Sequence, residues 1–267
     1  MSGFSKEQNR TPFKDKSFQT IEVSMDRMVL RIQMIRDTAK NSINIQFLEE
    51  ITWVFKQIVS NTSCKVILLK GNSDYFCTGL DFQSISTDNI EKNPYLYFDL
   101  LQLFSTSPQI VISQVEGAVK AGGIGLIAAS DIVVAGARAT FSLSEALFGI
   151  LPACVMPFLI RRIGHQKAKL MTLMTTNISS NRAYELGLVD ELGNNNCKEL
   201  VRKLVLRLSK LETSVIQHIK SYTNEFYIID DDDRKIATDT LIKLLKSKKV
   251  QQNMDNYING GVLPWNK

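Results

Sequence analysis

A glycine-rich turn and a single carboxylate that follows it along the chain are the residues best suited to chemistry. The turn, residues 121–125, reads Ala-Gly-Gly-Ile-Gly and lies between a β-rich run and a helix of small residues. Glycines at such a junction let the main chain approach a ligand closely, and they leave the first N–H groups of the helix free. Glu145 follows on a predicted loop. Free N–H groups and one carboxylate are the parts needed to hold an oxyanion and to move a proton.

The hydrophobic pattern around these residues is typical of an α/β core in which strands alternate with helices. Residues 66–69 form a continuous apolar run, as in a strand buried within a parallel sheet. Asn44 is a suitable N-cap for a helix that continues to residue 58. Further strands are predicted at 20–23, 28–34, 109–115 and 132–135, and further helices at 95–105, 165–175, 182–186 (capped by Ser180), 198–209, 213–224 and from 234 onward.

Length and composition exclude several classes of protein. The chain has 267 residues, of which 44% are hydrophobic, which is enough for one large domain with its own core. No apolar run is long enough for a membrane span, and no basic-aromatic motif points to nucleic acid. The four cysteines lack metal-ligand spacing, which favours free thiols in a cytoplasmic protein. Residues 1–17 are polar and are expected to form a flexible N-terminal tail.

Charged residues and histidines outside residues 121–145 are expected to have structural roles or to attract acidic partners. A net charge of +5 suits the phosphates of coenzyme A or an acidic carrier protein. The aspartates at 230–233 lack the glycine and terminal glutamate of an EF-hand, so we expect a helix start there instead of calcium. His165 and His218 fit no catalytic or metal-ligand pattern and are expected at the surface.

Two motifs resemble the enoyl-CoA hydratase/isomerase (crotonase) superfamily. They are VEGAVKAGGIGLIAASDIVVA, at 115–135, and FCTGLDF, at 76–82. The resemblance implies an α/β fold, the crotonase (ClpP/crotonase-like) spiral of ββα units, over residues 18–195. It also implies a C-terminal helical oligomerisation region over residues 196–267 and therefore a homotrimer or a dimer of trimers.

The resemblance also implies roles for individual residues. The backbone N–H groups of Leu80 and Gly122 would form an oxyanion hole for a thioester enolate, with Gly79 and Gly123 binding substrate beside them. Glu145 aligns with the second catalytic glutamate of the family and would be the acid/base. The alternatives are that the glycines only permit close packing and that Glu145 is a solvated loop residue.

Gly125 departs from the pattern of the family. Hydratases that use two glutamates place the first of them here, so ordinary two-glutamate hydration is in doubt. One alternative is that Glu145 does both jobs, because syn-elimination lets one group take the α-proton and protonate the leaving hydroxyl. The other is that Asp81 supplies the second catalytic group, although many members of the family hold an aspartate there for structure.

The segment SLSEALFGILPACVMPFLIRRIGHQKAKLMTLMT, at 142–175, and the terminal GVLPW resemble one branch of this superfamily. It contains the dehydratases of the HMG-CoA-synthase-type (β-branching) cassettes of polyketide biosynthesis. That resemblance implies removal of water from 3-hydroxy-3-methylglutaryl-acyl carrier protein, with no metal or nicotinamide cofactor. Two alternatives stay open: a hydratase, isomerase or decarboxylase that acts on a CoA thioester, and an inactive crotonase-fold scaffold.

Overall fold

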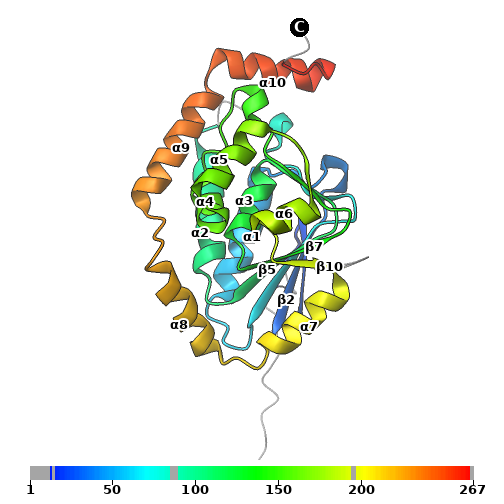
Figure 1. Cartoon of the computed structure of the whole chain (residues 1–267), viewed down its shortest axis with the longest axis vertical. Coiled ribbons are helices and arrows are strands. Elements are labelled where there is room, and N and C mark those ends of the chain that lie inside the picture. Colours follow the sequence, from blue (N-terminus) through cyan, green and yellow to red (C-terminus); the bar gives the residue numbers. More distant parts are fainter. Residues whose placement is uncertain (1–12, 14–15, 85–89, 194–196, 265–267) are drawn as a thin grey trace, which may run out of the picture.

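Two β-sheets form the frame of the molecule, with helices packed beside them (Figure 1). The computed structural model describes residues 13, 16–84, 90–193 and 197–264. Most of the expected tail, 1–17, therefore lies outside the described residues. Phe13, which is described, is buried, and its ring lies 6.2 Å from the ring of Trp53.

The larger sheet has six strands, and its interior strands are almost wholly buried. Its order is β1 (Ile21–Asp26), β2 (Val29–Met34), β3 (Val66–Lys70), β5 (Ile110–Val115), β7 (Ile132–Gly136) and β10 (Glu191–Gly193). Only the pairing of β1 with β2 is antiparallel among these strands. The continuous apolar run of β3 is thus explained, because parallel strands covered on both faces carry no alternating polar residues.

The smaller sheet consists of four short strands, three of which follow a strand of the larger sheet along the chain. Its order is β4 (Tyr75–Cys77), β6 (Ala118–Lys120), β8 (Thr140–Ser142) and β9 (Ile178–Ser179). The first three run parallel to one another, and each follows β3, β5 or β7 along the chain. A helix follows β4 and β6, which gives the repeated ββα turn of the predicted spiral.

Helices fill the space beside the sheets, and the last of them wrap around the outside. The α-helices are α1 (Ile45–Ile58), α2 (Lys92–Thr106), α3 (Gly122–Ala129), α4 (Met156–Ile163), α5 (His165–Met174), α6 (Ser180–Leu186), α7 (Lys198–Leu208), α8 (Thr213–Asn224), α9 (Asp231–Leu245) and α10 (Lys248–Gly260), and the 3₁₀ helices are η1 (Asp37–Ala39), η2 (Phe82–Ser84) and η3 (Glu145–Phe148). In Figure 1, α8 lies at the lower left, α9 runs up one side and α10 crosses the top.

Charged side chains attach these outer helices to the core. On α8, the buried Lys220 ammonium donates to Asp131 Oδ2 at 2.6 Å and to the Gln109 carbonyl oxygen at 2.9 Å. On α9, the Arg234 guanidinium donates to both oxygens of Asp99, at 2.6 and 2.9 Å. A buried charge such as that of Lys220 is stable only when it is paired and hydrogen-bonded, as it is here.

Most of the helix boundaries expected from the sequence are confirmed, with one shift in a cap. Asn44 caps α1, because its side chain accepts from Phe47 N at 2.9 Å. Asp230 forms a capping box at the start of α9, which confirms the helix start predicted for the acidic run. The cap of α6 is Ser179 instead of Ser180, since Ser179 has the extended backbone of an N-cap and accepts from Arg182 N.

Metal-ligand and membrane features are absent from the described part of the chain. No helix within the described ranges is long and apolar enough to cross a membrane. Groups of three or more histidines, cysteines or acidic residues placed to hold a metal ion are also not found there. The four cysteines are buried and unpaired.

Candidate active site

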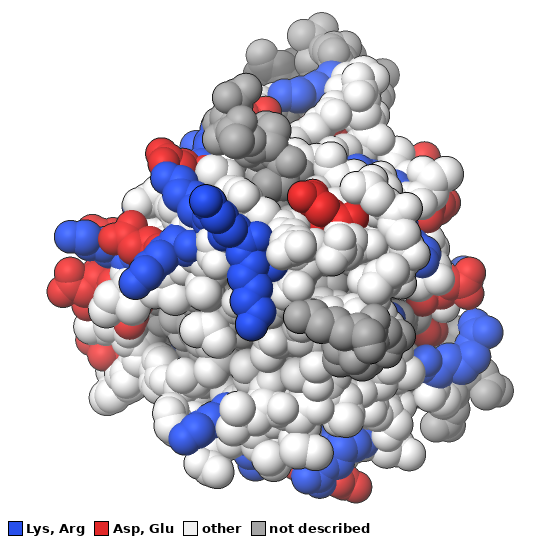
Figure 2. Space-filling model, turned by 90° about the horizontal axis from the view of Figure 1, so that it is seen from above, with Lys and Arg blue, Asp and Glu red and all other residues white. Residues whose placement is uncertain are grey.

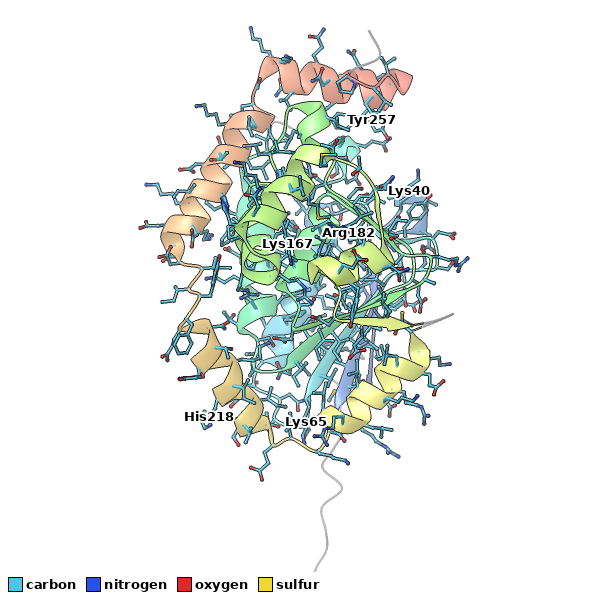
Figure 3. The ribbon with its side chains drawn as sticks, viewed as in Figure 1. Lys40, Lys65, Lys167, Arg182, His218 and Tyr257 are labelled. Atoms are coloured by element: carbon cyan, nitrogen blue, oxygen red, sulfur yellow. The ribbon has the colours of Figure 1, made fainter. Side chains whose placement is uncertain are left out.

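A cavity of about 750 Å³ opens between the smaller sheet, α2, η3 and the last helix. Its walls include Leu80, Gly122 and Glu145, which are the residues singled out from the sequence. Lys40 and Tyr257 also line it, and Figure 3 places both in the upper part of the molecule, near α10. His218 lies on α8 at the opposite end, where it is exposed, and His165 is also exposed.

The register of the smaller sheet brings together the residues that the sequence analysis assigned to the site. Cys77 of β4 pairs with Val119 of β6, and Lys120 of β6 pairs with Ser142 of β8. Leu80, Gly122 and Glu145 each follow closely after the end of one of these three parallel strands. Carboxyl ends of parallel strands meet at one edge of a sheet, so three segments far apart in the sequence converge on one wall of the cavity.

The Leu80 N–H points away from the adjacent segment at Ile43 and is left without a partner among the described residues. Its flanking residues bond to Ile43, which donates to Gly79 O at 2.7 Å and accepts from Asp81 N at 2.9 Å. In extended backbone, successive N–H groups point to opposite sides. Leu80 N–H therefore points away from Ile43 and is available to an acceptor in the cavity.

Gly122 supplies the second N–H, at the first residue of α3. A first helical residue has no intrahelical acceptor for its N–H. The preceding Ala121 has φ +50° and ψ −125°, a conformation that alanine rarely adopts, and its own N–H donates to Ser142 O at 2.9 Å. Strain of this kind persists only where the surrounding structure imposes it, and it often marks functional sites.

Glycine at two further positions lets the loops approach each other. A methyl group added to Gly79 would lie 2.5 Å from the Ala121 side chain and 2.9 Å from Gly122 N. One added to Gly123 would lie 2.5 Å from Cys77 O. Neither Gly79 nor Gly123 is among the described residues that line the cavity. The substrate-binding role assigned to them from the sequence stays a prediction, whereas close packing explains why glycine is needed there.

Glu145 begins η3 and is the carboxylate that faces the cavity in an apolar setting. Its Oε2 atom is buried and finds no hydrogen-bond partner among the described residues. Burial raises the pKa of Glu145 from its ordinary value of 4.5 to about 7, although the main-chain N–H groups of Glu145 and Ser144 partly oppose this shift. A carboxyl with such a pKa exists in both protonation states near neutral pH and suits general acid–base catalysis.

Asp81 also lines the cavity, but it already has strong partners. Its Oδ2 atom accepts from the Arg36 guanidinium at 2.7 Å, and its Oδ1 atom accepts from Gln83 N at 3.2 Å. Arg36 also donates to Ser42 O, so it ties two loops together through Asp81. This arrangement supports the structural reading of Asp81 more than the catalytic one, which stays a prediction.

The space that a side chain at position 125 would need is filled by the side chain of a tyrosine, Tyr97. A methyl group added to Gly125 would lie 2.1 Å from the Tyr97 hydroxyl oxygen and 3.1 Å from Leu101 Cδ1. Tyr97, on α2, is 8% exposed, lines the cavity and donates to Gly122 O. Sequence reasoning missed this residue. The glycine at 125 was a signal that something bulky lies beside it, but the pattern of α2 does not show which side chain that is.

Comparison with known proteins shows what the chain is similar to. A model of the family described as enoyl-CoA hydratase/isomerase matches residues 24–267. The bacillaene synthase dehydratase PksH of Bacillus subtilis is 38% identical over 255 residues, which are 93% of this chain and 97% of that protein. The 2,3-dehydroadipyl-CoA hydratase of Escherichia coli is 30% identical over 176 residues, covering 64% of this chain and 68% of its own length.

Solved structures show the same fold. The crystal structure of a polyketide biosynthesis enoyl-CoA hydratase from Bacillus subtilis has a TM-score of 0.82 at 37% identity, and the match covers 93% of this chain and 100% of that one. An enoyl-CoA hydratase structure from Mycobacterium avium paratuberculosis has a TM-score of 0.83 at 22% identity, which shows the fold alone.

The contact between Tyr97 and Gly125 can be tested by a four-protein stability cycle. Alanine in place of glycine inside a helix normally stabilises by about 1 kcal/mol. Gly125→Ala is expected to destabilise the wild-type protein, because the methyl group meets the Tyr97 hydroxyl, and to cost about 1–2 kcal/mol less in a Tyr97→Phe background. Urea unfolding of the wild type, both single variants and the double variant measures this difference. Equal costs in the two backgrounds would contradict the contact.

The buried Glu145 carboxyl predicts a stability difference that depends on pH. A carboxyl whose pKa is raised by folding stabilises the folded state below its unfolded pKa, and this stabilisation is lost as pH rises through about 7. Glu145→Gln removes the titration. It should unfold at the same urea concentration as wild type at pH ~4, below the ordinary pKa of 4.5, and should be more stable by about 3 kcal/mol at pH ~9. The control is Glu225→Gln, at an exposed position. A Glu145→Gln effect that is equal at both pH values would contradict the desolvated carboxyl.

Proposed function

This chain belongs to the enoyl-CoA hydratase/isomerase family of enzymes, and we propose that it is a hydro-lyase that removes water from a 3-hydroxyacyl thioester. The proposed substrate is 3-hydroxy-3-methylglutaryl-acyl carrier protein, and the product is the 3-methylglutaconyl thioester, formed during β-branching of a polyketide. The 38% identity with a relative named as a dehydratase of bacillaene synthase supports this choice.

One observation carries the proposal: a desolvated carboxyl shares a cavity with two backbone N–H groups that are free for an oxyanion. Removing the α-proton of a thioester places negative charge on its carbonyl oxygen. Leu80 and Gly122 N–H can stabilise that charge, and each such donor contributes about 3 kcal/mol to the transition state. These donors and one carboxylate suffice for the reaction, so the proposal calls for no metal or redox cofactor.

Glu145 serves as both base and acid in the proposed reaction. In its ionised form it takes the proton from C2 of the acyl chain, and in its protonated form it passes that proton to the departing hydroxyl on the same face. A pKa of about 7 makes both transfers accessible at neutral pH. The glycine at 125 is consistent with a single acid/base group, because it places no second carboxylate at that position.

Basic side chains near the cavity support a substrate carried on a phosphopantetheine arm. Lys40 and Lys120 line the cavity, and Lys40 Nζ lies 5.6 Å from the Tyr75 ring. Figure 2, seen from the side of α10, shows lysine and arginine side chains gathered in a band beside largely uncharged surface. An acidic carrier protein would be attracted to such a surface, and its phosphate would find cations at the cavity.

We also propose the homotrimer, or dimer of trimers, and a cytoplasmic location. Exposed apolar side chains concentrate on the outer helices and their connections, as expected of surfaces that pack against another subunit. They include Leu170, Leu173, Met174, Val215, Ile219, Tyr222, Phe226, Tyr227, Ile228 and Ile236. The four unpaired cysteines support a reducing compartment.

Intact-mass spectrometry of the acylated carrier protein tests the proposed function. The carrier protein bearing 3-hydroxy-3-methylglutaryl is incubated with wild type, with Glu145→Gln and with Glu225→Gln, and the matching CoA ester is run in parallel. Wild type and Glu225→Gln should remove one water, faster from the carrier protein than from CoA. Glu145→Gln should be slower by about 10³-fold, because the proton has no acceptor.

Each other outcome points to a different function. No loss of water from either thioester, with turnover of a simple enoyl-CoA, would replace the proposal by a CoA-thioester hydratase. No turnover of any thioester would favour a binding or scaffold role. Full activity of Glu145→Gln would contradict the assignment of the acid/base.

A further inference from the structure

We propose that Tyr97 is a further catalytic residue, whose phenol oxygen accepts a hydrogen bond from the leaving hydroxyl during dehydration. The inference rests on the proposed function and names the group that binds the departing oxygen. It follows from the place of Tyr97 in the cavity that Gly122 and Glu145 also line, and from the hydrogen bond that the Tyr97 hydroxyl already makes.

The Tyr97 hydroxyl is held at the start of α3. It donates its proton to Gly122 O, the carbonyl of the same residue whose N–H is free for the oxyanion. A methyl group added to Gly122 would lie 3.4 Å from the Tyr97 oxygen. A phenol whose proton is already donated still has lone pairs on its oxygen, so it can act toward a bound ligand as an acceptor.

The same oxygen fills the space where a side chain at position 125 would begin. The 2.1 Å separation between the Tyr97 oxygen and an added methyl on Gly125 means that the tyrosine requires this glycine. Gly122 and Gly125 lie nearly one turn apart on α3, on the same side of the helix. This face of α3 carries no polar side chain at Gly122 or Gly125, and the Tyr97 hydroxyl of α2 supplies a polar group there.

Burial keeps the Tyr97 phenol neutral. Burial raises its pKa well above 10, and the nearby Cys77, Cys154 and Glu145 raise it further. Burial likewise raises the pKa of the Cys77 and Cys154 thiols to about 12. Glu145 and Tyr97 line the same cavity. Tyr97 therefore acts as a neutral hydrogen-bonding group, and Glu145 remains the group that transfers the proton.

Other polar groups at the cavity are less suited to this task. Asp81 accepts from Arg36 and from a main-chain N–H, and the Cys154 thiol lies 3.8 Å from Pro94 O as a donor. Tyr97 combines a cavity position with an oxygen that still has acceptor capacity.

The step balances with Tyr97 unchanged at its end. Glu145 takes the C2 proton, and the electron pair of that bond forms the enolate whose oxygen rests on Leu80 and Gly122 N–H. The enolate re-forms the carbonyl, the C2–C3 double bond forms and the C3–O bond breaks, while Glu145 returns its proton to the departing oxygen to give water. Throughout, the hydrogen of the hydroxyl itself is donated to Tyr97. This bond strengthens as the hydroxyl is protonated and becomes a better donor, so it favours the transition state over the bound substrate.

Tyr97→Phe tests the inference, with Tyr95→Phe as the matched control. Tyr95 lies on the same helix, and its hydroxyl contacts Asp239 outside the cavity. For dehydration of 3-hydroxy-3-methylglutaryl carrier protein, Tyr97→Phe should lower kcat by about 30- to 300-fold and change KM less than about threefold. Tyr95→Phe should leave both constants unchanged.

A second readout separates contact with the leaving group from support of the oxyanion hole. A 3-methylglutaryl thioester lacks the 3-hydroxyl, and exchange of its C2 proton in D₂O needs only Glu145 and the two N–H donors. Tyr97→Phe should retain this exchange at the wild-type rate. Loss of exchange in parallel with dehydration would overturn the inference, because Tyr97 would then act only by holding Gly122.

The outcomes also distinguish this inference from the proposed function. Wild type that dehydrates the carrier-protein substrate, with Tyr97→Phe equally active, would overturn the role of Tyr97 and leave the function standing. Wild type that exchanges C2 protons but never releases water would overturn both, because there would be no leaving hydroxyl to bind.

Discussion

The desolvation of one carboxyl is the constraint on which the rest of the site depends. Removing Glu145 from water raises the free energy of its ionised form, and that cost is what brings its pKa to about 7. The apolar wall has to be closed for this to happen, and Phe148 of η3, Val250 of α10 and Leu245 of α9 form one buried cluster beside it. The C-terminal helices thus supply part of the apolar packing beside η3.

The close approach of two loops is the second requirement, and it explains the unusual backbone at the site. Gly79 has φ +87° and contacts Ala121, whose own positive φ is held by the parallel pairing of β6 with β8. This strained backbone directly precedes Gly122, which lines the cavity. Tyr97 stabilises the other side of the same glycine by donating to Gly122 O. Tyr97 thereby links the start of α3 to the cavity wall.

The sequence predicted the parts of this site that are local, and missed those that depend on packing. Gly122 and Glu145 lie in continuous motifs, and the resemblance of these motifs to the crotonase superfamily implied that the two residues share one site. The Arg36–Asp81 ion pair and the Tyr97–Gly125 contact join residues on separate elements, and no periodicity along the chain indicates such pairs. The shift of the α6 cap from Ser180 to Ser179 has a local cause: two adjacent serines are equally good caps, and the pairing of β9 with β8 decides between them.

Direct titration of the Glu145 carboxyl tests the central claim most closely. In protein labelled with ¹³C at glutamate side-chain carboxyls, the resonance absent from Glu145→Gln identifies this group, and its shift can be followed from acid to alkaline pH. The account predicts a midpoint at about 7, as expected of a carboxyl removed from water. A midpoint near the ordinary value of 4.5 would show that Glu145 is solvated and would contradict its role as the single acid and base.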